Sequence, residues 1–153
     1  MVVVNNKEEL KALINQRIEE QGPNCDLNDI DVSKVEDMSD LFMDSTFNGD
    51  ISQWDTSNVR DMSYMFSGSK FNSAISSWNV SRVVNMRCMF SCSEFNKDIS
   101  KWDVSNVEDM EGMFYDSKFS GDLSKWDVSN VKSMRCMFWG SPLNGKEPTW
   151  YRG

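Results

Sequence analysis

Acidic side chains recur at a fixed spacing in this chain. One column contains four aspartates and one asparagine, placed 24 residues apart: Asp31, Asp55, Asn79, Asp103 and Asp127. On adjacent strands such carboxylates would lie about 5 Å apart and repel one another, so a stripe of them could attract a basic protein or Ca²⁺. The favoured alternative is that each side chain accepts hydrogen bonds from the nearby backbone in an Asx turn. Calcium is disfavoured because the glycine- and aspartate-rich nonapeptide of calcium-binding β-rolls is absent.

The other reactive residue types argue against catalysis. The chain contains no histidine, which excludes Ser–His and Cys–His nucleophile pairs. It also lacks a P-loop, a GxGxxG turn and a zinc-type Cys/His cluster. We therefore expect a protein that is not an enzyme and that uses no cofactor and no metal. Cys88 and Cys136 lie two repeats apart and Cys92 follows Cys88 by four residues, so we expect the cysteines to be reduced.

These positions belong to a repeat that organises nearly the whole chain. A tryptophan returns every 24 residues after Ile30, which holds the same position in the first repeat: Trp54, Trp78, Trp102, Trp126 and Trp150. A second aromatic column has no exception: Phe42, Phe66, Phe90, Phe114 and Phe138. A fixed period of this length is typical of solenoids, in which each repeat packs only on its neighbours. Nine of the eleven methionines lie in such columns, which favours a core position over a methionine-rich binding groove.

Each repeat is expected to contain one strand and one helical turn. Alternating apolar residues over 51–59 predict a short strand with Trp54 facing inward. Met62, Met65 and Phe66 have the i, i+3, i+4 spacing of one helix face, and a capping residue precedes them. Stacked repeats would place short parallel strands on one side and short helical turns on the other. The sequence thus predicts a repeat solenoid with an N-terminal capping helix.

Segments outside the repeat are expected to close the two ends of a single domain. Residues 1–26 are predicted to form an N-terminal capping helix and linker, with the helix over 5–21. Residues 27–149 would form five solenoid repeats of 24 residues. Residues 150–153 would form a C-terminal cap or tail.

The outward positions vary between repeats, and repeat proteins use such positions to form a binding face. Exposed aromatic and arginine side chains are the more effective binding anchors. The candidate partner-binding residues are three aromatics, two arginines and three members of the acidic column: Tyr64, Tyr115, Trp139, Arg87, Arg135, Asp55, Asp103 and Asp127. Ordinary surface variation stays open as the alternative.

Charge and hydropathy bound the partners and the location. The net charge of −8 argues against direct nucleic-acid binding, which needs clustered Lys and Arg. No apolar run approaches the ~18 residues of a membrane span, so we expect no membrane contact. The N-terminus lacks the basic start of a signal peptide, which favours a cytoplasmic protein, with a domain of a cell-surface protein as the alternative.

The repeat resembles that of the BspA-like leucine-rich repeat surface proteins, in the form of the Mycoplasma-type domain of unknown function. Two stretches carry the resemblance: WDTSNVRDMSYMFSGSKFN and WDVSNVEDMEGMFYDSKFSGDLS. It covers about residues 27–150 and implies a leucine-rich-repeat-like solenoid with a binding or adhesion role. We therefore predict a non-enzymatic module that binds a protein partner. The alternative is a small acidic inhibitor, phage-encoded and of an anti-defence or nucleic-acid-mimic type, that acts on a host enzyme.

Overall fold

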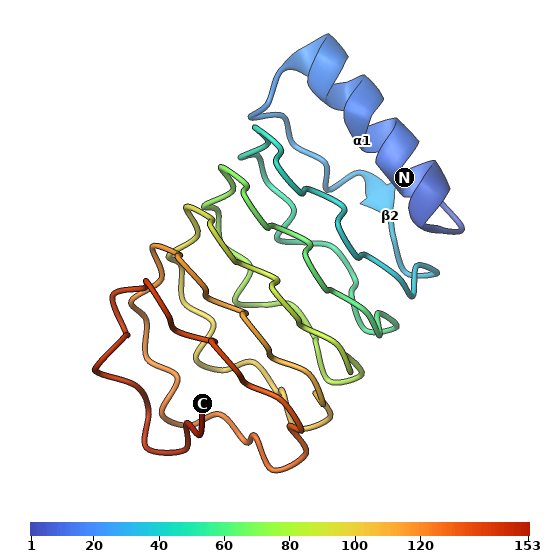
Figure 1. Ribbon diagram of the computed structural model, residues 1–153. Coiled ribbons are helices and arrows are strands. Elements are labelled where there is room, and N and C mark those ends of the chain that lie inside the picture. Colours follow the sequence, from blue (N-terminus) through green and yellow to red (C-terminus); the bar gives the residue numbers. More distant parts are fainter.

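The computed structural model describes residues 1–153 and contains one helix and two short strands. The helix is α1 (Lys7–Gln21), and β1 (Val2–Val3) pairs in parallel with β2 (Ile30–Asp31). The rest of the ribbon winds in successive turns that lie side by side, with α1 across one end of the stack (Figure 1). We call these turns coils 1 to 5; they begin at residues 27, 51, 75, 99 and 123.

Helix α1 begins two residues later than the helix predicted over 5–21 and ends where that prediction placed its end. The Asn6 side chain accepts a hydrogen bond of 2.9 Å from the Glu9 amide, which satisfies one of the free amides of the first turn. The helix ends at Gly22, whose φ of 89° is readily adopted only by glycine. Leu10 and Ile14 are buried, so this face of the helix packs on the core at the first coil.

The columns of identical side chains are stacked in the interior. Phenylalanine rings of one column follow each other at centroid distances of 5.4 to 5.8 Å and lie within 9° of parallel. Each repeat tryptophan donates its indole N–H to a carbonyl of the preceding coil over 2.8 to 3.1 Å, as Trp54 does to Leu27. The indole therefore fills the core and also satisfies a buried backbone oxygen.

The segment predicted to be a strand folds differently. Over 51–59 the chain forms two turns, in which Trp54 N–H donates to Ile51 and Val59 N–H to Thr56, over 3.2 and 3.0 Å. Trp54 and Thr56 are buried as expected, but no strand is present there. One further parallel bridge joins Asp26 to Asp50, and the bridges between successive coils lie at one position of each coil: Asp37, Asp61, Asn85, Asp109 and Ser133. Alternation in the sequence thus identified the inward side chains, because successive turns can produce the same alternation as a strand.

The predicted helical turns are also replaced by overlapping turns. We call these runs the turn segments, which cover residues 38–45, 62–69, 86–93, 110–117 and 134–141. Within one run, Met65 N–H donates to the Met62 carbonyl over 3.2 Å, but Tyr64 and Gly68 have φ angles of 57° and 67°. Residues of positive φ cannot continue a right-handed helix. The same two positions have positive φ in every coil, which explains why no helix forms there.

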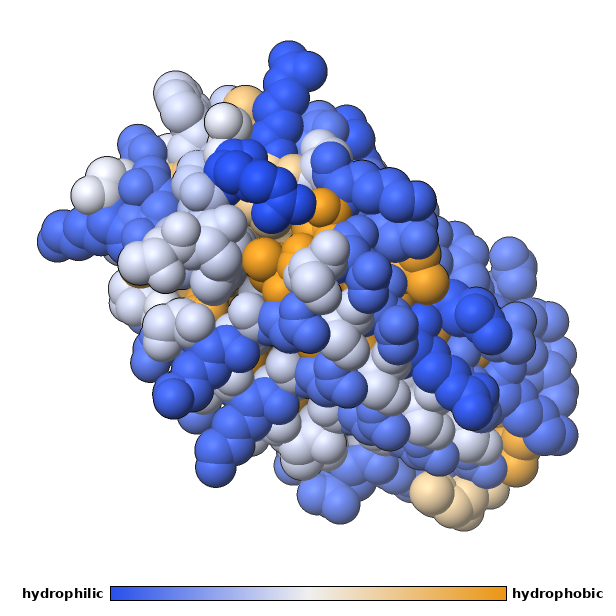
Figure 2. All heavy atoms as spheres, turned by 90° about the horizontal axis from the view of Figure 1, so that it is seen from below, coloured by the Kyte–Doolittle hydropathy of each residue, from blue (hydrophilic) through white to orange (hydrophobic).

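The cysteines, the C-terminal residues and the surface complete the description of the fold. The four cysteines form no disulfide. Trp150 continues the tryptophan column at 6.4 Å from Trp126, and Tyr151 packs edge-on to Phe138 at 5.1 Å. No helix in the structure has the length and apolar character needed to cross a membrane. The surface seen in Figure 2 is mostly hydrophilic, with small apolar areas between polar side chains.

Candidate interaction surface

The acidic column is held by local hydrogen bonds. Asp55 and Asp103 each accept two hydrogen bonds from the serine two residues later, from its amide at 3.0 and 3.1 Å and from its hydroxyl at 2.6 Å. Asp127 accepts one from the Ser129 amide at 3.0 Å, and its bonds to Ser129 lower the pKa of this carboxyl. The Asx-turn interpretation is therefore confirmed for all three. No group of three or more acidic or cysteine side chains is arranged to hold a metal ion.

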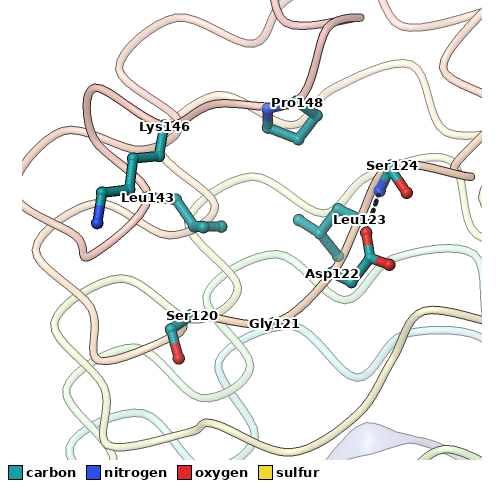
Figure 3. A pocket seen from close by; sticks show the side chains of 8 residues that line it. All are labelled: Ser120, Gly121, Asp122, Leu123, Ser124, Leu143, Lys146 and Pro148. Atoms are coloured by element: carbon teal, nitrogen blue, oxygen red, sulfur yellow. Dashed lines mark hydrogen bonds between the residues drawn. The ribbon is translucent and has the colours of Figure 1, made fainter.

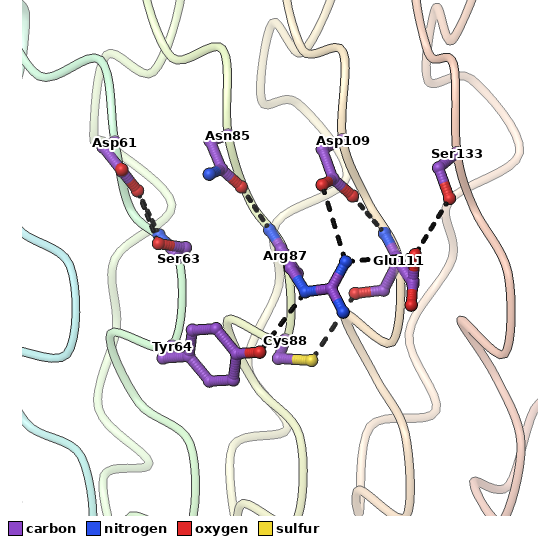
Figure 4. A network of polar contacts seen from close by, with 9 residues as sticks. All are labelled: Asp61, Ser63, Tyr64, Asn85, Arg87, Cys88, Asp109, Glu111 and Ser133. Carbon is purple, nitrogen blue, oxygen red and sulfur yellow. Dashed lines mark hydrogen bonds and ion pairs between the residues drawn. The ribbon is translucent and has the colours of Figure 1, made fainter.

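A polar network joins the turn segments of neighbouring coils (Figure 4). The Arg87 guanidinium lies 3.1 Å from Glu111 and 4.0 Å from Asp109, and its Nε donates to the Tyr64 hydroxyl over 3.3 Å. The hydrogen bond to Tyr64, together with the two carboxylates, raises the pKa of Arg87 above its ordinary value. Ser133 adds a hydrogen bond of 3.3 Å to Glu111. Two of the predicted candidates, Tyr64 and Arg87, are thus in direct contact, in a network that reaches from coil 2 to coil 5.

Two other candidates form an exposed aromatic pair. The rings of Tyr115 and Trp139 are stacked at a centroid distance of 5.0 Å with an interplanar angle of 18°. Tyr115 is 37 % exposed and Trp139 is 57 % exposed. Met43, Ser67 and Ser91 hold the same position in the first three coils. The pair is therefore a local feature of coils 4 and 5, and not a requirement of the repeat.

Arg135 and the three aspartates are separate from these groups. Arg135 holds the same position in coil 5 as Arg87 in coil 3, is exposed and forms no ion pair. Asp55, Asp103 and Asp127 lie in the turns that follow each repeat tryptophan and share no hydrogen bond or ion pair with the aromatic residues. The eight predicted residues thus divide into a network, an aromatic pair, a free arginine and an acidic column.

Two further features of this surface were not predicted from the sequence. Glu111 anchors the Arg87 network, and the only signal for it was the opposite charge in one column, Arg87 followed by Glu111 and Arg135. A shallow pocket of about 300 Å³ also opens between coils 4 and 5 (Figure 3). Its lining comes from two short stretches: Ser120, Gly121, Asp122, Leu123, Ser124, Leu143, Lys146 and Pro148. The available sequence signal was Pro148, which replaces the serine found at this position in the preceding repeats: Ser52, Ser76, Ser100 and Ser124.

The pocket offers little for chemistry. Lys146 is its one cationic side chain, and Asp122 already accepts a hydrogen bond of 2.9 Å from the Ser124 amide. That bond lowers the pKa of the Asp122 carboxyl, so the group is a weak proton acceptor. The exposed aromatic pair and its neighbours are consequently the better candidate for a functional surface.

Comparison with known families gives one match. A family model described as a Mycoplasma protein of unknown function, DUF285, matches residues 10–118 and again residues 91–150. Together the two matches span most of the chain, and their overlap is expected for a repeat that fits the model in more than one register. No curated protein and no solved structure matches the chain.

Proposed function

This chain belongs to the DUF285 family, and we propose that it is a non-enzymatic binding module that recognises a protein partner through side chains on its turn segments. Within the family we assign it to the BspA-like leucine-rich-repeat type. The assignment is supported by interior side chains and backbone hydrogen bonds that repeat in one register from coil to coil. A stack of this kind is a rigid support for variable outward residues.

The observation that carries the proposal is the stacked pair of Tyr115 and Trp139. Serine holds this position in coils 2 and 3, so the fold does not need an aromatic residue there. Large rings that are exposed and already ordered by each other lose little conformational entropy on binding. Tyrosine, tryptophan and arginine are also the residue types that dominate the binding energy of protein interfaces.

The Arg87 network supports the same surface. Tyr64, Arg87 and Glu111 hold one another in fixed positions on three successive coils. A partner that meets this surface would therefore find polar groups whose geometry is set before binding. Such preorganisation favours specificity, because a competing partner with a different charge pattern would break the network.

The proposal is tested with substitutions that the repeat itself supplies. Trp139→Ser and Tyr115→Ser introduce the residue that coils 2 and 3 carry at this position, so the fold should be retained. The tagged protein would be used to capture proteins from cell lysates and surface extracts, and captured proteins would be identified by mass spectrometry. We expect the specific partner to be recovered at least about tenfold less with either variant.

Met43→Ser is the matched control, because Met43 holds the same position in coil 1 and is 46 % exposed. It should retain the partner. Equal capture by the native chain and all three variants, or no specific capture at all, would contradict the proposed function.

The second candidate function is the small acidic inhibitor. Its support is the net charge of −8, which would attract the basic groove of a nucleic-acid-binding enzyme. The inhibitor function requires that binding to the target enzyme weakens steeply as the salt concentration rises, and that nucleic acid competes with this protein for the enzyme. Asp55→Asn, Asp103→Asn and Asp127→Asn together should then weaken binding, whereas the aromatic-pair proposal expects little change from them.

A further inference from the structure

Exposed apolar side chains gather on one face of the coil stack. Seven large apolar side chains are exposed, and three of them belong to residues 1–3. The other four all lie on the turn segments: Met43, Tyr64, Tyr115 and Trp139. Single exposed apolar residues need no explanation, whereas several on one face indicate an interaction site. The positions between Met43 and Tyr115 show what this face can hold.

The Tyr115 ring has one open side. One face of the ring stacks on Trp139 at 5.0 Å, and the other is turned toward coil 3, where Ser91 holds the equivalent position. Ser91 is buried, and its hydroxyl lies 2.8 Å from that of Ser67 in coil 2. We call Ser67 and Ser91 the serine step, because both are less exposed than Tyr115 and Met43 on either side. Coils spaced like strands, about 4.8 Å apart, leave room over this step for a planar group on Tyr115.

Two free carboxylates border the serine step. The turn segments contain four acidic side chains, and two of them are paired: Asp40 with lysines of α1 and Glu111 with Arg87. The other two, Asp44 and Asp116, are exposed and form neither an ion pair nor a side-chain hydrogen bond within the chain. Each directly follows one of the two large side chains beside the step. These carboxylates are therefore available to a partner.

The next coil fixes where these carboxylates lie. A Cβ atom at Gly68 would collide with Oδ1 of Asp44, and one at Gly140 would lie 3.1 Å from Oδ1 of Asp116. Each aspartate therefore leans along the stack, over a glycine of the following coil. Cys92 lies between the two glycines in the same column. Burial raises the pKa of its thiol, and the charges of Asp116 and Asp44 add to this effect. The negative charge of both aspartates thus reaches the column beside the serine step.

Nearby cations require that attraction at this site is local. Arg135 lies four residues before Trp139, Lys118 lies two residues after Asp116, and neither forms an ion pair. Acidic and basic side chains are thus mixed here, and the surface has no strong field of one sign. Selectivity must come from contact: a guanidinium stacks on a tyrosine ring and donates parallel hydrogen bonds to a carboxylate. A neutral ligand would cover the free carboxylates and return no charge to them.

We infer that the serine step binds an arginine side chain of a partner polypeptide. The guanidinium stacks on the open face of Tyr115 over Ser91 and donates hydrogen bonds to the Asp44 carboxylate, which lies over the adjacent coil 2. A second basic side chain of the same segment pairs with Asp116 beside Trp139. This inference rests on the proposed function, of which it specifies the partner chemistry and the place of binding.

The test uses the intact ¹⁵N-labelled protein and three short peptides, of alternating Arg and Ser, Lys and Ser, and Gly and Ser. We expect the Arg/Ser peptide to shift the amide signals of Ser67, Ser91 and Tyr115. Its Kd should be at least about tenfold lower than that of the Gly/Ser peptide at low salt. It should also be lower than that of the Lys/Ser peptide, because an ammonium group has no planar face to stack on the ring. Equal Kd values for the Arg/Ser and Lys/Ser peptides would overturn the inference.

The same spectra detect two other occupants of the serine step, a neutral sugar and a second copy of the chain. Maltohexaose should leave the amide signals of Ser67, Ser91 and Tyr115 in place, and so should raising the concentration of the protein alone. If maltohexaose bound there as tightly as the Arg/Ser peptide, the occupant would be a glycan and the inference would be wrong. Shifts of these signals with protein concentration would instead assign the step to a second copy.

Asp44→Asn and the control Asp55→Asn separate a local site from general charge attraction. Both substitutions remove one negative charge from an exposed residue, and Asn79 already holds the Asp55 position in coil 3. The Asp44 carboxylate has no hydrogen bond to lose, and asparagine tolerates its φ of 55°. We expect Asp44→Asn to weaken Arg/Ser peptide binding at least about tenfold and Asp55→Asn to leave it unchanged. Equal loss with both variants would contradict a local site.

Tyr115→Ser tests the contribution of the ring. It introduces the residue that coils 2 and 3 carry at this position and leaves every charge in place. We expect the preference for the Arg/Ser peptide over the Lys/Ser peptide to disappear, because stacking on the ring is its cause. A preference that survives in Tyr115→Ser would show that the guanidinium does not stack there.

The outcome also distinguishes this inference from the proposed function. A protein whose capture of a partner depends on Trp139 but which ignores the Arg/Ser peptide retains the proposed function and loses the arginine site. A protein that binds the peptide at the serine step but captures no partner through Trp139 shows the reverse.

Discussion

The two ends of the coil stack are closed in different ways. At the N-terminal end, α1 buries Leu10 and Ile14 on coil 1, and β1 adds backbone hydrogen bonds to β2. At the C-terminal end, Trp150 and Tyr151 cover the core. Four backbone amides of coil 5 have no hydrogen-bond partner there: those of Met134, Cys136, Phe138 and Gly140. A repeat array thus has two separate requirements at its ends. It must bury the last apolar layer, and it must satisfy the backbone groups that would have met another coil.

The largest expected difference concerns stability. Ile14→Ala should lower the free energy of unfolding by roughly 2–5 kcal/mol, because it leaves a cavity at a site that is 1 % exposed. Tyr151→Ala should cost less, about 1–2 kcal/mol, since this ring is only half-buried. Urea denaturation of both variants measures the difference. Equal losses of unfolding free energy in the two variants would show that both ends of the stack are closed equally well.

The second difference concerns the backbone amides. In the free protein, the amides of Cys136 and Gly140 should exchange hydrogen at least about 100-fold faster than those of Gly112 and Asp116 in coil 4. The reason is that the coil 4 amides donate to coil 5, whereas the coil 5 amides have no acceptor. Exchange followed by NMR compares like positions in adjacent coils. If the amides of both coils exchanged at the same rate, the C-terminal segment would supply hydrogen-bond acceptors to the amides of Cys136 and Gly140.

A third difference concerns acid. Arg17 donates to Asp29 through two hydrogen bonds of 2.9 and 2.8 Å, and this contact lowers the pKa of Asp29. The contact therefore stabilises the fold above the unfolded pKa of about 3.9, and its contribution is lost as the pH falls through the lower folded pKa. Asp29→Asn should cost at most about 1 kcal/mol at neutral pH, because the pair is partly exposed.

The cost of Asp29→Asn should vanish at a pH well below the folded pKa, where the native carboxyl is also protonated. Denaturation at neutral and at strongly acid pH measures this change. A cost that stays the same at both would show that the carboxylate charge contributes nothing at the N-terminal end.

The smallest expected difference compares one position at both ends. Cys136 and Asp40 have φ angles of 57° and 52° in equivalent turns of coils 5 and 1. Cys136→Gly should stabilise the protein by roughly 0.5–1 kcal/mol, because glycine adopts this conformation without strain. Asp40→Gly should give no gain, since Asp40 also lies 3.8 and 3.5 Å from the lysines of α1, Lys7 and Lys11. Thermal denaturation of both variants compares the effects, and a gain for Asp40→Gly would indicate that these ion pairs are negligible.

Much of the candidate site was predictable from residue types, but its contacts were not. Tyr64, Arg87, Tyr115 and Trp139 were expected to be outward because they lie outside the constant columns. Their pairing depends on which outward side chains of adjacent coils reach each other. Tyr64 and Arg87 are 23 residues apart and do not share a column, so no spacing rule linked them. The acidic column was predicted more completely, since each Asx turn depends on a serine two residues away.

The sequence by itself determined which side chains enter the core, because a constant 24-residue spacing places like residues in like environments in every coil. It also determined the capping helix, whose start and stop signals are local. Only the tertiary structure decided the direction of the backbone. Positive φ at two positions of each turn segment points alternate amides toward the next coil. That conformation is held by hydrogen bonds from these amides to carbonyls 23 residues later in the chain. Side-chain periodicity carries no information on where an amide points, so the donor row at the C-terminal end became visible only in the folded chain.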